Sequence, residues 1–202
     1  MKWKSVLNWC DECDERAKPF TQSDEGQYGG IFVIPIGAKQ YIVDIQCYMT
    51  MHQCEHIYYK VTEHADTIES RLLVLEQYYY IFAEDSLTYG IEEPKNDPKG
   101  EFVRLTDSLA YGITFPPEIE APLLTVERRY RLSGGCGLST VYDVSGDCPK
   151  VIEFRAKLFC SPESPGPKQW KLYTAKQRAR WRIVPNPQRK DWKPSATPAC
   201  SK

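Results

Sequence analysis

Cysteine is the residue of this chain best able to do chemistry, because a thiol can form a disulfide, bind a metal or act as a nucleophile. The 202 residues include eight cysteines, an even number and a high one for a protein of a reducing compartment. They are Cys10, Cys13, Cys47, Cys54, Cys136, Cys148, Cys160 and Cys200. We therefore predict disulfide bonds.

A metal site or a redox pair would be alternative uses of the N-terminal cysteines. Zinc could take its ligands from Cys10, Cys13, Cys47, Cys54 and His56. However, a structural zinc site usually has two close pairs of ligands, and only Cys10-x-x-Cys13 forms such a pair. The same pair resembles a redox motif, but the acidic residues at 11, 12 and 14 oppose a thiolate there. We expect no metal and no cofactor.

Other side chains with catalytic potential form no ordered set. The three histidines, His52, His56 and His64, would need a nucleophile such as Ser70 or Cys54 within hydrogen-bond reach. The sequence contains no Gly-x-Ser-x-Gly turn, phosphate-binding loop or His-Glu-x-x-His motif. We interpret the histidines as surface or turn residues and predict that the protein is not an enzyme.

Cationic and aromatic residues are interleaved at the end of the chain, a combination that binds anionic surfaces. Residues 167–202 carry ten basic side chains and one acidic one, whereas residues 1–166 carry 16 basic and 26 acidic ones. This tail can therefore dock on the acidic body of its own chain or on an anionic partner. The expected partner is an acidic protein surface or protein complex, with an anionic membrane as the alternative and no nucleic acid. The candidate binding residues are Trp170, Arg178, Arg180, Trp181, Arg182 and Trp192.

The N-terminal residues lack the features of a secretory signal, because acidic residues follow Cys10 before an apolar stretch of ~7–15 residues can form. The chain is then either the mature form of an exported protein or a cytoplasmic protein with thiols or metal ligands. The cysteine content favours a periplasmic or other extracytoplasmic, lumenal location. No apolar run reaches the ~18 residues of a membrane-spanning helix.

Alternating apolar and polar residues between the cysteines are typical of half-buried strands. We expect a short helix within residues 1–20, a first β meander over 21–90 and a second over 91–166. An extended, proline-rich tail is expected over 167–202. Residues 41–47 and 57–61 should pair, and residues 71–80 form one further apolar stretch. The prediction is a mainly β fold of two small antiparallel sheets or a sandwich.

The clearest hairpin is predicted from residues 138–144 and 150–159, which flank a turn rich in Gly and Asp. Centring the turn near residue 148 places Cys136 opposite Cys160, within bonding distance. Closing this loop of about 25 residues would stabilise the fold by about 3 kcal/mol. The glycines of Gly134-Gly-Cys-Gly137 could bind an anion, but we favour close backbone approach beside the disulfide.

Two segments of the chain resemble an uncharacterised family of exported bacterial proteins, the domain of unknown function 1176. They are the strand Tyr41-Ile-Val-Asp-Ile-Gln-Cys47, and the turn Gly134-Gly-Cys-Gly137 with the return strand Val151-Ile-Glu-Phe-Arg155-Ala-Lys157. The family usually has Asp where this chain has Gly135. The resemblance implies export, a mainly β fold and disulfides formed by Cys13, Cys47, Cys136 and Cys160. The other cysteines would be additions, with Cys10–Cys54 and Cys148–Cys200 as guessed pairs.

These features together predict a non-enzymatic, disulfide-stabilised exported protein that binds a protein complex or a membrane face through its basic tail. The alternative is a periplasmic ligand-binding or enzyme-inhibitor module that uses residues 52–56 and the turn at Gly134 to Gly137. A cytoplasmic, zinc-bound accessory protein for nucleic acids is the third interpretation.

Overall fold

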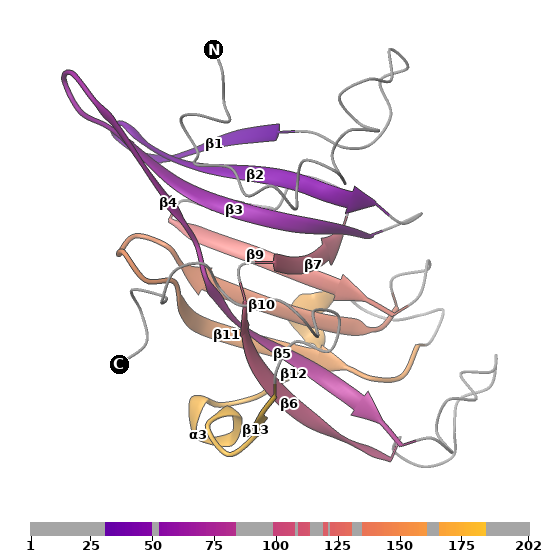
Figure 1. Cartoon of the computed structure of the whole chain (residues 1–202). Helices are drawn as coiled ribbons and strands as arrows, with labels where there is room; N and C mark the ends of the chain where they lie inside the picture. The colour runs from indigo at the N-terminus through magenta and orange to yellow at the C-terminus, as the bar shows by residue number, and fades with distance from the viewer. Residues whose placement is uncertain are drawn as a thin grey trace.

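The computed structural model describes residues 31–49, 53–83, 99–107, 109–113, 119–120, 122–130, 135–160 and 166–184. Strands dominate these residues and form three sheets, so the mainly β fold is confirmed (Figure 1). The predicted helix within residues 1–20, Cys13 and Trp192 lie outside the described residues, and of Cys47 only the backbone is described. No described helix is long and apolar enough to cross a membrane.

The first sheet contains β1 (Ile31–Gly37), β2 (Gln40–Met49), β3 (Gln53–Glu63) and β4 (Ile68–Leu72) in that order, and β7 (Leu109–Ile113) also pairs with β3. β2 and β3 pair antiparallel with Val43 opposite Tyr59, which confirms the predicted pairing. Alternation gives the sheet two apolar faces, because Val43 and Tyr59 join one cluster of buried residues while Ile42 and Tyr58 join another.

The second sheet has the order β12-β11-β10-β9-β8. Its strands are β8 (Ile119–Glu120), β9 (Leu123–Arg129), β10 (Gly137–Asp143), β11 (Lys150–Lys157) and β12 (Lys171–Leu172). Leu124 and Tyr142 of this sheet pack in the same buried cluster as Ile42 and Tyr58 of the first sheet. The main core therefore lies between these two sheets.

The third sheet contains strands from both halves of the chain. The prediction of one β meander in each half did not include such a sheet. It consists of β5 (Leu75–Phe82), β6 (Gly100–Asp107) and the short parallel strand β13 (Arg182–Ile183). The apolar stretch at 71–80 is not one strand, because the chain leaves the first sheet after β4 and enters the third at β5 (Figure 1). Leu73 and Leu75 are both buried at this junction. The run of buried apolar residues therefore continues from the first sheet to the third, although the two strands belong to different sheets.

The predicted hairpin and its disulfide are present, but the strand register differs from the predicted one by two residues. Centring the turn near residue 148 would set Gly137 against Phe159, whereas Gly137 pairs with Lys157, and a bulge follows Val141. Cys136 and Cys160 are nevertheless bonded, with their Cα atoms 4.6 Å apart, which confirms this pair. β11 ends at Lys157, so the three residues after it bring Cys160 back to Cys136.

Residues 166–184, hereafter the C-terminal segment, do not form the expected extended tail. They contain a 3-10 turn η2 (Pro167–Gln169), β12, the single-turn helix α3 (Ala175–Arg178) and β13. Thr174 caps α3, because its side chain accepts a hydrogen bond from the Gln177 backbone N–H and the Gln177 side chain accepts one from the Thr174 backbone N–H. The segment lies on the body at the end that carries β5 and β6 (Figure 1).

Candidate functional site

The predicted binding residues divide into buried and exposed groups. The side chains of Trp170 and Arg178 are buried, with exposed fractions of 3% and 6%, and that of Trp181 is half-buried. Arg180 and Arg182 are exposed. Trp170, Arg178 and Trp181 therefore contact the body of their own chain, in agreement with the self-docking that the sequence left open for the tail.

Arg178 holds the C-terminal segment to the body through two hydrogen bonds and makes a third within the segment. Its Nε donates to the Tyr78 hydroxyl at 3.1 Å, its Nη1 to the Tyr173 carbonyl at 2.6 Å and its Nη2 to the Val151 carbonyl at 3.5 Å. Burial, together with the charge of Glu76, raises the pKa of Tyr78 to about 12 in spite of the nearby guanidinium. Tyr78 is itself buried under the segment.

Trp181 lies in a cluster of aromatic rings between the segment and the body. Its indole stacks on Phe102 at 4.6 Å between centroids, and it meets Phe154 and Tyr78 edge-on at 5.5 and 5.4 Å. Tyr173, from the same segment, lies 5.5 Å from Trp181. Such ring pairs add about 0.5–1.5 kcal/mol each beyond simple burial, so the cluster fixes the segment firmly.

Glu153 and Arg155, from the Glu-Phe-Arg-Ala run of β11, form a second anchor for the C-terminal segment. Glu153 accepts hydrogen bonds from the Arg155 side chain, the shorter at 2.6 Å, and raises the pKa of that guanidinium. Arg155 then donates from Nη1 to the carbonyls of Lys168 and Trp170 at 2.9 and 3.2 Å. The carboxylate orients the guanidinium, and the guanidinium orders the start of the C-terminal segment.

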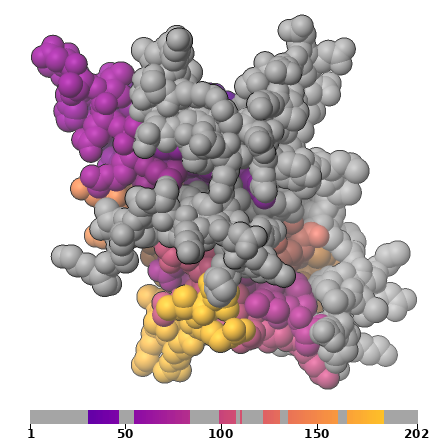
Figure 2. Space-filling model, in the orientation of Figure 1, coloured from indigo at the N-terminus to yellow at the C-terminus, as the bar shows by residue number. Residues whose placement is uncertain are grey.

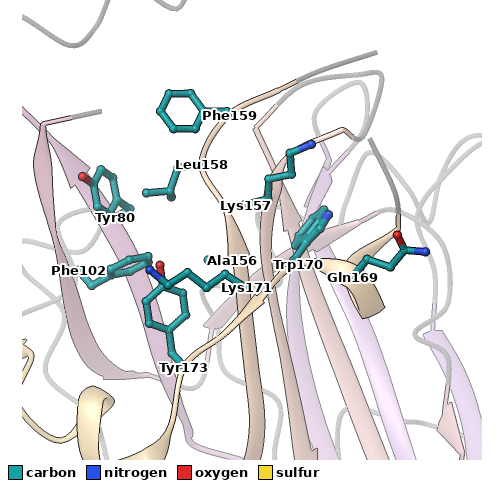
Figure 3. A pocket seen from close by; sticks show the side chains of 10 residues that line it. All are labelled: Tyr80, Phe102, Ala156, Lys157, Leu158, Phe159, Gln169, Trp170, Lys171 and Tyr173. Atoms are coloured by element: carbon teal, nitrogen blue, oxygen red, sulfur yellow. The ribbon is translucent and has the colours of Figure 1, made fainter. Parts of the chain in front are cut away.

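The segment forms one side of an open pocket of about 370 Å³. Figure 3 shows the pocket between β5 and β6 on one side and the end of β11 with β12 on the other. Its aromatic lining residues are Tyr80, Phe102, Phe159, Trp170 and Tyr173. Its cationic lining residues are Lys157 and Lys171, and none of the described residues that line it is acidic. Binding pockets combine apolar walls with a few polar groups in the same way.

The cations of the C-terminal segment other than Arg178 are exposed. The segment contains no acidic residue, and its six cations are Lys168, Lys171, Lys176, Arg178, Arg180 and Arg182. Among the described residues only Arg182 of these six pairs with a carboxylate, that of Glu101 at 2.5 Å. The pocket therefore lies beside a positively charged segment, which is coloured yellow at one end of the molecule in Figure 2.

His56 is not a surface or turn residue, which corrects the interpretation from sequence. It lies in β3 with an exposed fraction of 1%, and its Nδ1 is 2.9 Å from the Asp44 carboxylate on β2. The two residues lie between the first and second sheets, on the face that carries Ile42 and Tyr58. His64 is exposed, and His52 lies outside the described residues. In the described part of the chain, no three metal-ligating side chains cluster.

Gly137 of the glycine turn allows close backbone approach beside the disulfide, as the sequence indicated. A Cβ at Gly137 would lie 2.1 Å from the Arg128 carbonyl, and the backbone φ is +155°. Gly137 therefore lets β9 and β10 approach beside Cys136. Cys148, at the hairpin turn, is also disulfide-bonded. The guessed pairs Cys10–Cys54 and Cys148–Cys200 each include a residue outside the described part of the chain.

Sequence reasoning missed most residues of the pocket. Tyr80, Phe102, Phe159, Lys171 and Tyr173 come from strands that are distant in the sequence or from the segment assigned as an extended tail. A local signal existed in Lys171-Leu-Tyr173, whose alternation places Lys171 and Tyr173 on one face. The local sequence does not show that this face lies against β6, because that contact forms only when the segment folds onto the body.

Comparisons with known proteins identify no relative of this chain. No protein-family model matches this chain, and neither a curated protein nor a solved structure matches it. The resemblance to the domain of unknown function 1176 therefore stays a prediction.

Proposed function

We propose that this protein is a non-enzymatic, disulfide-stabilised binding module of an extracytoplasmic compartment. Its binding surface is the C-terminal segment with the aromatic pocket beside it, and its partner is an acidic protein surface. The Cys136–Cys160 bond supports the compartment, because structural disulfides persist outside the cytoplasm.

The outward charge of an ordered segment is the main support for this binding surface. The segment does dock on its own body, but through Arg178, Trp181 and the carbonyls bound by Arg155. Lys168, Lys176 and Arg180 take no part in ion pairs with described carboxylates. Self-docking and partner binding are therefore compatible, because different side chains perform them.

A ligand-binding or inhibitor module is the alternative, and the pocket is the observation that favours it. The residues first considered for that role do not serve it, since His56 is buried against Asp44 and Gly137 is packed against Arg128. The pocket supplies an open site in their place, and a small ligand without a protein partner would occupy it.

Charge reversal at the segment tests the proposed surface. The variant Lys176→Glu/Arg180→Glu is compared with the matched variant Lys39→Glu/Lys150→Glu, which changes net charge equally at exposed positions elsewhere. Binding of a labelled oligo-glutamate peptide is measured by fluorescence anisotropy at low and physiological salt. We expect the first variant to lose about tenfold in affinity and the second less than about twofold, with salt weakening the wild type.

Equal losses in both variants would mean that only net charge matters and would contradict a dedicated surface. A peptide map of the native, unreduced protein tests the compartment separately. We expect a linked pair of peptides containing Cys136 and Cys160. Alkylation of these two thiols without reductant would remove the support for an extracytoplasmic location.

A further inference from the structure

We infer that the pocket receives an aromatic side chain from an acidic peptide segment, and that Lys171 pairs with a carboxylate next to that side chain. The inference rests on the proposed function, because it names the feature of an acidic partner that the pocket recognises. It also distinguishes this surface from one that attracts any polyanion.

The size of the pocket suits one amino-acid side chain. Its volume of about 370 Å³ is near the lower end of the range of ~300–1,000 Å³ that ligand sites have. A large cofactor would not fit, whereas one aromatic ring with its flanking backbone would.

The pocket offers aromatic contacts to such a ring. Phe102 lies between Tyr80 and Tyr173, with 4.9 Å between ring centroids in both pairs and interplanar angles of 72° and 60°. Leu158 lies beside Tyr80, and Lys157 and Trp170 line the opposite side (Figure 3). Because aromatic rings prefer offset or edge-to-face neighbours, a further ring can extend this row.

The charge of the pocket selects an acidic neighbour for that ring. The Lys171 side chain reaches over Tyr173, with its Nζ 5.1 Å from the ring centroid (Figure 3). Lys171 makes no ion pair with a described carboxylate, and the described residues that line the pocket include no carboxylate. An aromatic residue flanked by Asp or Glu would place its ring against the aromatic lining and the neighbouring carboxylate near the Lys171 ammonium. An aromatic residue without an acidic neighbour would contact only the aromatic lining.

Three labelled peptides of equal length test the inference with the full chain. The first has Phe flanked by Glu, the second has Ala in place of Phe, and the third has Gln in place of Glu. We expect the first peptide to bind about tenfold tighter than either of the others when binding is measured by fluorescence anisotropy. Tryptophan fluorescence is the second measurement, because Trp170 lines the pocket and Phe does not interfere with its emission.

Substitution of Lys171 provides the matched comparison. Lys171→Met should weaken the Phe–Glu peptide about tenfold and leave the Phe–Gln peptide unchanged, and Lys171→Arg should restore most of the loss. The control Lys176→Met removes an equal charge outside the pocket and should weaken both Glu-containing peptides by the same small factor. Lys171 and Lys176 are exposed, so melting temperatures should not change.

The outcomes separate this inference from the proposed function. Equal affinity for the Phe–Glu and Ala–Glu peptides would overturn the inference and leave an acidic partner in place. Equal losses from Lys171→Met and Lys176→Met would do the same. If no acidic peptide binds, or if anionic lipid vesicles bind and peptides do not, both proposals are wrong.

Discussion

Two buried cations, Lys60 and Arg178, are stabilised by carbonyl oxygens. The Lys60 ammonium donates to the carbonyls of Val144, Ser145 and Gly146 at 3.2, 2.5 and 3.1 Å. Arg178 donates to two carbonyls and one hydroxyl. Carbonyl dipoles can replace the hydration of a cation, but a carbonyl left without a donor in a buried site is costly. Both side chains are therefore structural, although their charge suggests a surface.

Substitution of Gly137 tests the close approach beside the disulfide. Gly137→Ala should lower the free energy of unfolding by about 2 kcal/mol or more, because the added methyl would overlap the Arg128 carbonyl. Gly166→Ala is the control, since no atom lies within 4 Å of its Cβ position, and it should change stability by less than about 0.5 kcal/mol. Urea unfolding measures both, and equal effects would contradict the contact.

Alkaline titration tests the burial of Tyr78. The pKa of this hydroxyl is raised from 10.0 to about 12 in the folded protein, so the folded state holds the proton more tightly than the unfolded state. The resulting stability is present below pH 10.0 and is lost as the pH rises to about 12. Tyr78→Phe should therefore make the free energy of unfolding fall less steeply over this range. Parallel curves for wild type and variant would contradict a buried Tyr78.

At the scale of elements, the C-terminal segment is held by a few strong contacts at separate points. Its two strands, β12 and β13, have two residues each, so sheet pairing alone would not fix it. Arg155 holds its start, Arg178 its single-turn helix and Trp181 its end. This arrangement orders the segment while its other cations stay exposed.

Replacing Arg178 should release this segment. We expect Arg178→Met to lower the free energy of unfolding by about 2–4 kcal/mol, because two carbonyls and the Tyr78 hydroxyl lose their donor. Arg180→Met, two residues further and exposed, should cost less than about 0.5 kcal/mol. Hydrogen exchange of residues 171–183 provides the local measurement. Faster exchange in the Arg180 variant alone would contradict the assigned anchor.

At the scale of the molecule, side-chain contacts join the three sheets. Lys60 of the first sheet binds the turn of the hairpin in the second sheet, and Arg71 lies 3.2 Å from Asp147 at the same turn. The Tyr142 hydroxyl of the second sheet donates to the Glu76 carbonyl of the third at 2.8 Å. These contacts, with the core between the sheets, make their packing specific.

Lys60→Met tests the connection between the first and second sheets. It keeps most of the side-chain volume but leaves three carbonyls without their donor, so we expect a loss of about 2–3 kcal/mol in the free energy of unfolding. Lys150→Met, an exposed position at the start of β11, is the control and should be nearly neutral. A Lys60→Met protein as stable as the wild type would contradict a structural role for this ammonium in joining the two sheets.

Features that depend on neighbouring residues could be predicted from the sequence. Alternation located β2 and β3, and the turn between β10 and β11 brought Cys136 close enough to Cys160 even though the predicted register differed by two residues. The split near Leu73 was missed, because buried apolar residues continue across it without a turn signal. His56 was misassigned because nothing in the local pattern shows its partner on β2.

By itself, the sequence determined the fold class, one disulfide and the charge of the C-terminal part, since these follow from local period, residue type and loop length. The tertiary structure alone decided that Arg178 and Trp181 are anchors and that Tyr80, Phe102 and Lys171 meet in one pocket. The reason is physical, because burial and ring packing depend on contacts between residues far apart in the chain, which local patterns do not encode.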